Sequence, residues 1–482
     1  MADEYSMFID GAWTGSESGA VFDATSPSTG EVIGTVPQGT REDVGQAIDG
    51  ANRAWPTWAA MSAFDRSAAM GRIGAAIEAR RDDLARTLAL DQGKPLVAEA
   101  RDEVEELIVY FSMAGEDAVR ADGLLPPSVD ANKRVLVQRV PRGVVGVISP
   151  WNWPYTMPAE IVAPALAYGN AVVLAPAPTT SVCAVKLAEC IAEADLPPGV
   201  FNLVTGPGPV VGDEVAANEG THAVGFIGSI ATGRRVAERA AGKELLLEMG
   251  GNGPLVVLED ADLDRAVEGT LSACFLNAGQ SCTAGERVLV HRDVHDEYVR
   301  RLGEAISARI RLGDPFEDET TMGPLNNTGV ADKTERHVED AASRGANVAV
   351  GGKRAPQHGS DLFFEATVVD GVTDDMEIAR EETFGPVVPV SAIDSEDEAI
   401  AIVNSSSYGL LSAIFTRDLR RGLRYAEAVR TGWVNVNEGT NYWESHLPFG
   451  GRSGSASGVG RVGGRFSMER LTELKTIVVD VS

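Results

Sequence analysis

Cysteine is scarce in this chain of 482 residues: there are four, and their spacing suggests no disulfide framework. Few, unpatterned cysteines are typical of proteins in a reducing cytoplasm, which is the location we expect. The chain also lacks a run of about eighteen apolar residues that could span a bilayer. Its first residues lack the basic and apolar segments of a signal peptide. We therefore expect no membrane partner.

Lysine is equally rare, with seven among 42 basic residues, and the formal net charge is −28. Nucleic acids and anionic membrane surfaces are bound through clustered cations, so this charge argues against both as partners. Abundant Asp and Glu with little lysine is typical of a salt-adapted surface. A high-GC genome would explain the arginine bias equally well, so both explanations stay open.

What the chain does contain is an alternation of short apolar runs with amphipathic segments, which predicts an α/β fold with mainly parallel sheets. The length predicts two or three domains, because one core rarely grows that large. We expect helix over 65–120 and a hairpin strand at 134–141. The other predicted strands are 143–149, 171–176, 200–204, 223–228, 254–258, 287–291, 432–437 and 474–481, with helices at 181–194, 232–241 and 296–311.

Cys282 differs from the other three cysteines in its surroundings. Cys183, Cys190 and Cys274 lie in apolar, helix-like segments, where a free cysteine usually serves as buried packing. The stretch "FLNAGQSCTAGE" around Cys282 consists mostly of small residues that cannot enclose it. We therefore expect an exposed thiol that acts as a nucleophile.

Two further residues have the chemistry to assist a thiol. Glu248 follows an apolar strand and precedes a glycine pair, where a carboxylate can act as general base. Asn152 lies on a proline-stiffened loop directly after a predicted strand, and its amide can donate to an oxyanion. Each also has an ordinary explanation, since Glu248 could be a surface carboxylate and Asn152 a turn former. We expect no metal site.

Together these motifs resemble the aldehyde dehydrogenase superfamily, of the NAD(P)-dependent, hydrolytic type, over nearly the whole chain. The resemblance implies a Rossmann-like cofactor domain of residues 1–120 and 140–250 and an α/β catalytic domain of residues 251–447. It also implies a β-strand oligomerisation arm and tail, residues 121–139 and 470–482, that pair between subunits of a homodimer or homotetramer. The matching segments are "PWNWP" (150–154), "GFIGSIATGR" (225–234), "LEMGGNGP" (247–254), "NAGQSCTAGER" (277–287), "GDPFEDETTMGPL" (313–325), "EETFGP" (381–386) and "LPFGG" (447–451).

The resemblance implies that Cys282 attacks an aldehyde to form a thiohemiacetal, which hydride transfer to NAD(P) converts to a thioester. Asn152 and the backbone N–H of Cys282 would hold the oxyanion, and Glu248 would activate the water that releases the acid. Two alternatives are a CoA-acylating relative, in which a thiol replaces water, and a non-catalytic protein built on the same fold. Glu248 argues against the first, and the presence of all three residues argues against the second.

The cofactor site departs from the family pattern at the adenosine ribose. Ala175 stands where the family typically has lysine, and Pro178 where many NAD-dependent members have glutamate. With neither a cation nor a carboxylate there, we expect NAD or NADP to be used, with NAD moderately preferred. A second departure is segment 452–456, two residues longer than usual. The other residues assigned to the cofactor by resemblance are Trp151, Gly228, Ser229, Gly233, Glu382 and Phe384.

The substrate tunnel implied by the resemblance is aromatic and amphipathic, which predicts a medium-sized aldehyde with some polar function. Glu160 replaces a cation found in some semialdehyde-using relatives, so a carboxylated substrate is disfavoured. A solvated or core-facing Glu160 is equally compatible with the sequence. The expected tunnel residues are Trp153, Tyr155, Met157, Glu160, Ser281, Thr283, Tyr442, Trp443 and Phe449.

Overall fold

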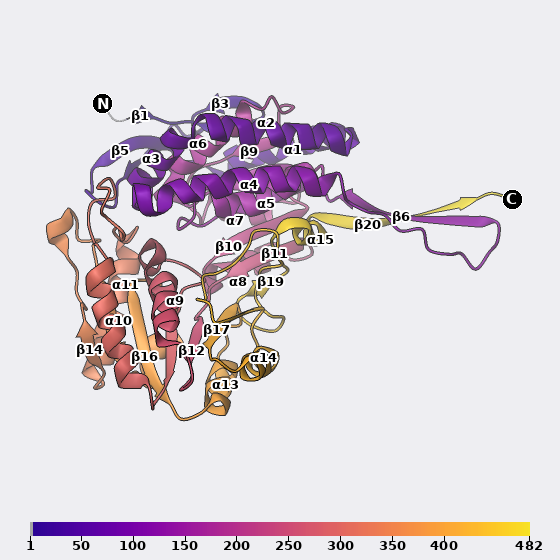
Figure 1. Ribbon diagram of the computed structural model, residues 1–482. Helices are drawn as coiled ribbons and strands as arrows, with labels where there is room; N and C mark the ends of the chain where they lie inside the picture. The colour runs from indigo at the N-terminus through magenta and orange to yellow at the C-terminus, as the bar shows by residue number, and fades with distance from the viewer. Residues whose placement is uncertain (1–2) are drawn as a thin grey trace.

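Two large sheets form the framework of the computed structural model, which describes residues 3–482 (Figure 1). The first sheet has eight strands, and its five central strands run parallel, with antiparallel strands at both edges. In spatial order they are β19 (Gly458–Val459), β11 (Glu244–Met249), β10 (Ala223–Gly228), β7 (Val144–Ile148), β8 (Ala171–Ala175), β9 (Phe201–Leu203), β2 (Met7–Ile9) and β3 (Ala12–Thr14).

Helices cover both faces of this sheet, which explains why its strands are apolar throughout rather than alternating. In β8, Val173 faces one helical layer, and its neighbour Val172 faces the other. One layer contains α1 (Arg41–Ala60), α7 (Val211–Ala217) and α8 (Ile230–Arg239). The other contains α2 (Ala63–Ala79), α3 (Arg81–Asp91), α4 (Arg101–Ala118), α5 (Thr156–Ala167) and α6 (Ser181–Ala192).

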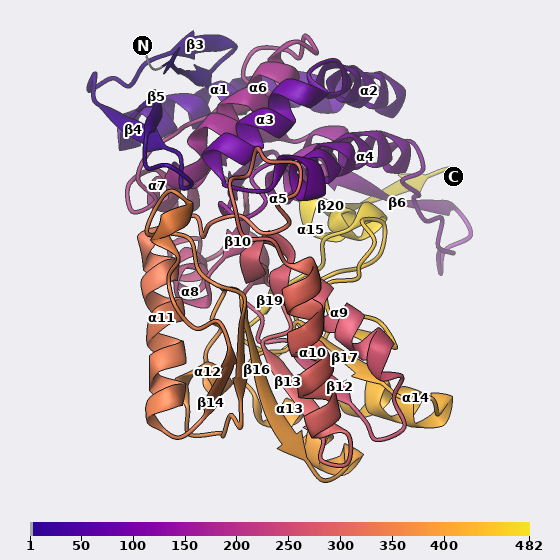
Figure 2. The same ribbon diagram turned by 60° about the vertical axis from the view of Figure 1, so that its left-hand side comes forward.

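The second sheet has seven strands and is likewise covered on both faces (Figure 2). Its strands run parallel except β14. They are β14 (Asn347–Val350), β15 (Thr367–Asp370), β16 (Val387–Ile393), β13 (Arg287–His291), β12 (Pro254–Val257), β17 (Leu411–Phe415) and β18 (Trp433–Val436). Helices α9 (Leu263–Phe275), α10 (His295–Arg309) and α11 (Thr328–Ser343) cover one face, and α13 (Glu396–Ser405) and α14 (Leu419–Ala428) the other.

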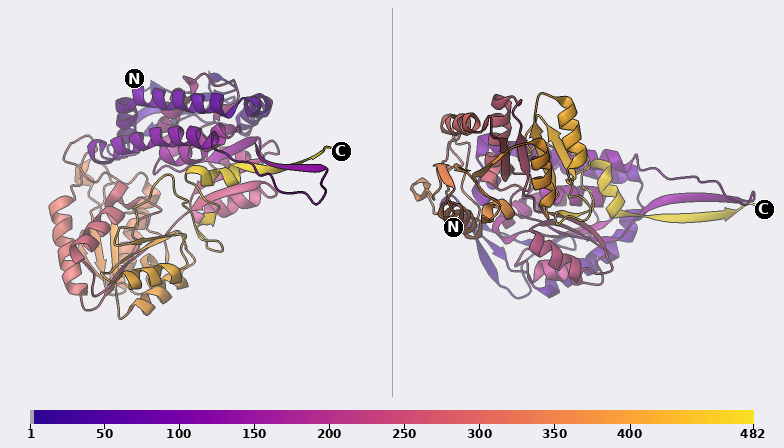
Figure 3. Two further views of the ribbon diagram at one scale, coloured as in Figure 1. Left: turned by 45° about the vertical axis from the view of Figure 1, so that its right-hand side comes forward. Right: turned by 90° about the horizontal axis from the view of Figure 1, so that it is seen from below.

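A two-stranded arm projects from the body of the molecule (Figure 3). It consists of β6 (Lys133–Pro141) and β20 (Thr472–Asp480), which pair antiparallel along their whole length. The strand predicted at 134–141 is confirmed, but its main partner comes from the far end of the chain rather than from a neighbouring hairpin strand. The preceding segment pairs with it only at an isolated antiparallel bridge between Leu124 and Val137. Among the described residues, the outer edge of β20 pairs with no further strand.

The predicted α/β fold with parallel sheets is confirmed. The region expected to be one long helical stretch is divided into α2, α3, a π-helical turn (Leu96–Ala100) and α4. The remaining elements are a small sheet of β1 (Asp3–Glu4), β5 (Val32–Pro37) and β4 (Val21–Thr25), and the short helices α12 (Glu377–Arg380) and α15 (Met468–Leu471). Across residues 3–482, no helix combines the length and hydrophobicity needed to cross a membrane.

Candidate active site

A cavity of about 390 Å³ lies where strands of the first sheet end and strands of the second begin. The loop after β7 contributes Asn152, and the end of β11 contributes Glu248. The loops that enter β13 and β16 contribute Cys282 and Glu382. Ligands of open α/β sheets bind at the carboxyl ends of the strands, so the fold places these side chains at an expected position.

The loop that carries Cys282 has an unusual backbone. After α9 ends, Asn277 and Ala278 have φ values of 50° and 52°, and Gly279 has 73°. A side chain at position 279 would overlap the carbonyl oxygen of Gly385. Buried amides stabilise this conformation, because Gln280 Nε2 donates to the Asn277 carbonyl at 2.9 Å. Buried hydrogen bonds therefore fix the backbone of the loop that carries Cys282.

The thiol of Cys282 is half-buried, so the expectation of an exposed cysteine is wrong. Burial raises its pKa, and the nearby charges of Glu382, Glu160 and Glu248 raise it further. At neutral pH the thiol is protonated, and a nucleophilic attack requires a base. The other three cysteines are buried, which confirms their assignment to packing.

The glycine pair at 250–251 allows two parts of the site to meet. A Cβ atom on Gly251 would overlap the carbonyl oxygen of Cys282, and one on Gly250 would lie 2.5 Å from Glu382 Oε2. The backbone N–H of Gly251 donates to Glu382 Oε1 at 2.9 Å. Larger residues here would separate the thiol loop from Glu382.

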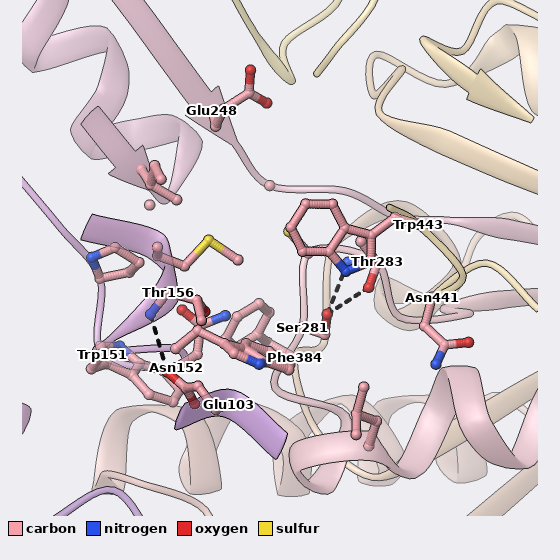
Figure 4. A pocket seen from close by; sticks show the side chains of 18 of the residues that line it. Glu103, Trp151, Asn152, Thr156, Glu248, Ser281, Thr283, Phe384, Asn441 and Trp443 are labelled. Carbon is pink, nitrogen blue, oxygen red and sulfur yellow. Dashed lines mark hydrogen bonds between the residues drawn. The ribbon is translucent and has the colours of Figure 1, made fainter. Parts of the chain in front are cut away.

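Glu248 is buried near the end of β11, and neither carboxylate oxygen has a hydrogen-bond partner among the described residues. Burial raises its pKa well above the ordinary value, Glu160 raises it further, and Arg461 partly opposes the effect. Figure 4 shows its side chain projecting away from the other labelled residues of the cavity. A buried, unpaired carboxylate is a stronger base than an exposed one.

Asn152 is buried beside the loop that carries Cys282. Its Nδ2 donates one hydrogen to the carbonyl of Gln280 at 3.0 Å, which leaves the second hydrogen available. The backbone N–H of Cys282 donates to no other residue within 3–482. Two unused donors thus belong to the cavity that contains the thiol, as stabilisation of an oxyanion requires.

The other end of the cavity has features that suit a dinucleotide. Ser229 caps the N-terminus of α8 by accepting the N–H of Thr232 at 3.3 Å, and Gly228 before it has a φ of 158°. A helix N-terminus that lines a cavity favours phosphate. Gly233 does not line the cavity; a side chain there would overlap Met249, so this glycine lets α8 pack closely on β11.

Phe384 adopts a strained backbone with a φ of 62°. Glu286 holds it there, because the N–H groups of Thr383 and Phe384 donate to its two oxygens at 2.6 Å each. The Phe384 ring meets Trp151 edge-on, with centroids 5.5 Å apart. No sequence signal marks Glu286, since its partners lie 97 and 98 residues away.

A buried ion pair supports the loop after β7. Lys94 contacts Glu103 at 2.5 Å and lies 3.8 Å from the ring centre of Trp153. Glu103 also accepts the N–H groups of Tyr155 at 3.0 Å and Thr156 at 3.3 Å. Helix α4 therefore positions the residues that follow Asn152. This helix face was not predicted from the sequence, although carboxylates recur along it at helical spacing.

Most of the expected site residues line the same cavity. Two tunnel residues do not: Tyr155 is buried in the core with its hydroxyl donating to the Leu84 carbonyl, and Tyr442 is exposed. Ala175 and Pro178 also lie outside the lining. The expected residues that line it are Cys282, Glu248, Asn152, Trp151, Gly228, Ser229, Glu382, Phe384, Trp153, Met157, Glu160, Ser281, Thr283, Trp443 and Phe449.

Comparison with known proteins shows which proteins the chain is similar to. The model of the aldehyde dehydrogenase family matches residues 13–477. An NADP(+) succinate-semialdehyde dehydrogenase of Escherichia coli (strain K12) is 38% identical over 473 residues, covering 98% of this chain and 97% of that protein. A solved succinate-semialdehyde dehydrogenase from Burkholderia pseudomallei has a TM-score of 0.96 at 38% identity, covering 99% and 98% of the two chains. A betaine aldehyde dehydrogenase from Staphylococcus aureus in complex with NAD+ has a TM-score of 0.95 at 34% identity, covering 99% and 95%.

Proposed function

The chain belongs to the aldehyde dehydrogenase family, and from that premise we propose that Cys282, Glu248 and Asn152 carry out its reaction. The enzyme oxidises an aldehyde to the carboxylic acid with NAD or NADP. The observation that carries the assignment of residues is the pair of unused N–H donors, on Asn152 and on the backbone of Cys282, in the cavity of the thiol.

In this proposal Glu248 accepts the proton of the Cys282 thiol, and the thiolate sulfur bonds to the carbonyl carbon of the aldehyde. Negative charge then moves to the carbonyl oxygen, where the two N–H donors stabilise it. A bound nicotinamide supplies the acceptor for the hydride that leaves this carbon. Glu248 releases that first proton to solvent and then takes a proton from water, the water oxygen bonds to the thioester carbon, and the carbon–sulfur bond breaks, with the proton on Glu248 returning to the sulfur. The acid leaves, and Cys282 is regenerated.

Water rather than CoA is the proposed acceptor of the acyl group. Glu248 lines the cavity without any hydrogen-bond partner among the described residues, so its carboxylate is available to activate water. An acylating enzyme needs no such base, because a thiol attacks the thioester readily. Glu248 therefore favours the hydrolytic reaction over the CoA-acylating alternative.

We propose that the enzyme uses either cofactor, with a moderate preference for NAD over NADP. The features that suit a dinucleotide are Ser229 at the start of α8, the Trp151–Phe384 pair and the buried carboxylate of Glu382. Near the expected adenosine ribose, Ala175 and Pro178 supply no charge. Because neither residue offers a cation to bind the 2′-phosphate of NADP, NAD is the preferred cofactor.

Assembly and location complete the proposal. The arm of β6 and β20 leaves exposed apolar side chains, including Leu474 and Val478, beside an unpaired strand edge. Such edges are normally covered, and a second copy of this chain would cover this one in a homodimer or homotetramer.

The proposed location is the cytoplasm, whose reducing conditions would keep Cys282 as a free thiol.

A product assay tests the proposed function. The protein is incubated with butanal and either NAD or NADP, with and without CoA, while NAD(P)H is followed by absorbance and products by mass spectrometry. We expect the free acid as product, with or without CoA. Butanoyl-CoA as the main product would instead support the acylating reaction, and no reduction of either cofactor would refute the proposal.

A further inference from the structure

The charge in the cavity is strongly unbalanced. Seven carboxylate side chains line it, against two lysines. Lys94 is already paired with Glu103. Lys333 lies 5.9 Å from the ring centre of Phe384, at the end that suits the cofactor. No cation therefore remains for the carboxylates of the substrate end.

Among these carboxylates, Glu160 shows the lack of a cationic partner most clearly. The side chain is only 4% exposed, and Oε1 accepts the hydroxyl of Tyr110 at 2.7 Å. Oε2 accepts no hydrogen bond and contacts no cation anywhere in residues 3–482. Burial and the neighbouring charge of Glu106 raise the pKa of Glu160 to about 8. Oε2 can therefore accept a hydrogen bond from a ligand, or lie against its positive charge, without losing a contact within the protein.

Helix α4 adds two further carboxylates beside Glu160. Asp102 and Glu106 are separated by one helical turn and both line the cavity. Neither has an ion-pair partner within the described part of the chain. Tyr110, one turn further on, is the residue that holds Glu160. One face of α4 and Glu160 of α5 thus form a continuous wall of carboxyl groups, and a cationic group placed beside it would favour their ionised form.

Aromatic rings lie next to this wall. The ring of Trp443 is 6.4 Å from that of Tyr110 and 5.6 Å from that of Phe449, measured between centroids. Trp443 and Phe449 both line the cavity. Aromatic faces attract cations, and they exclude the water that would otherwise solvate an anion. The carboxyl groups of the wall and the aromatic rings therefore both favour a cationic group.

We propose that the substrate is an aldehyde with a cationic nitrogen at the end remote from its carbonyl, and that Glu160 binds this nitrogen. The inference rests on the proposed function, since it names the substrate class of that same site. A carboxylate at the remote end, as in the semialdehydes, would instead find no cation to pair with, and it would face like charge wherever Glu160 and Glu106 are ionised. The cavity thus disfavours anionic substrates by repulsion and favours cationic ones by attraction.

Isosteric substrate pairs test the proposal in the wild-type enzyme. 3-Aminopropanal is compared with butanal, and 4-(trimethylammonio)butanal with 5,5-dimethylhexanal, so that each cation has an uncharged partner of the same shape. Succinate semialdehyde is the anionic probe. We expect kcat/KM to be higher for at least one cation than for its isostere by about tenfold or more, as a hydrogen-bonded charge provides. Succinate semialdehyde should be the poorest substrate.

Glu160→Gln locates the effect, because glutamine keeps the volume and can still accept from Tyr110. In this variant the ratio of kcat/KM for each cation to that for its uncharged isostere should fall toward one. Glu116→Gln, on the exposed part of the same helix, is the matched control and should retain the preference. If Glu160→Gln does not fold, the comparison of substrates in the wild-type enzyme still tests whether a cationic aldehyde is preferred.

The outcomes separate the two proposals. Oxidation of butanal and 5,5-dimethylhexanal as efficiently as both cations would overturn the cationic substrate and leave the dehydrogenase function standing. A preference for succinate semialdehyde would overturn it as well. Failure to oxidise any of these aldehydes with either cofactor would refute the proposed function itself. A cation preference that survives in Glu160→Gln would remove Glu160 from the binding site.

Discussion

The carboxylate of Glu248 lies against Gly450, where a Cβ atom would come to 2.5 Å from its Oε1. Within residues 3–482 no hydrogen bond holds it there, and none joins it to Cys282. The absence of a side chain at position 450 thus gives the carboxylate room beside the cavity. A base that takes a proton first from a thiol and then from a water must move between them. The side chain of Glu248 is free to move in this way because no hydrogen bond within residues 3–482 restrains its carboxylate.

Glu248→Gln should separate the two halves of the reaction. The amide cannot take a proton from water, so hydrolysis of the thioester slows more than hydride transfer does. We expect a burst of NADH stoichiometric with the enzyme, followed by a slow steady phase, in stopped-flow absorbance measurements. A variant with the wild-type steady-state rate would show that water is activated elsewhere.

The protonation of Cys282 predicts an alkaline pH dependence. Burial and the charges of Glu382, Glu160 and Glu248 raise the pKa of the thiol, so the thiolate fraction is small at neutral pH and grows as pH rises. The rate of labelling by iodoacetamide in the free enzyme should therefore keep rising beyond about pH 8.5, the pKa of an ordinary cysteine. Labelling that levels off below that pH would contradict the raised pKa. Mass spectrometry of the labelled peptide identifies the site.

The sequence predicts those parts of the fold that depend on local pattern. The strand Ala223–Gly228 was predicted with its observed ends, because its apolar run is bounded clearly. The partner of β6 could not be predicted, since pairing between distant segments leaves no local signal. The same limit applies to Glu286, whose partners are far along the chain. The exposure of Cys282 was misjudged because small neighbours in sequence do not reveal what other segments cover the thiol.

The choice of cofactor can be tested at Pro178, an exposed residue at the start of a 3₁₀ turn. Pro178→Glu adds a carboxylate that should repel the 2′-phosphate of NADP, and Pro178→Gln controls for the loss of proline. We expect the ratio of kcat/KM for NAD to that for NADP to rise about tenfold or more in the glutamate variant only. For the wild type, a preference above about a hundredfold would show that other residues set the choice.

Ala175→Lys should shift the same ratio toward NADP by adding a cation. Ala175 is buried at the end of β8, so the melting temperature of this variant must be measured alongside. If neither position changes the ratio in a folded protein, the adenosine ribose does not bind there.

The arm is tested by deleting residues 474–482, which removes most of β20. If this strand covers a subunit interface, the truncated chain should be monomeric or insoluble, because β6 then loses its partner and exposes a strand edge. Light scattering coupled to size-exclusion chromatography measures the mass. A soluble truncation that assembles like the full chain would contradict the assignment.

The most direct test of the account is the activity of Cys282→Ala. The substitution removes the sulfur that bonds to the substrate and leaves the backbone N–H in place. Cys190→Ala, at a buried cysteine outside the cavity, is the matched control. We predict that Cys282→Ala shows no oxidation of butanal above background and keeps the wild-type melting temperature, while Cys190→Ala remains active. Ordinary turnover by Cys282→Ala would contradict its role as the nucleophile.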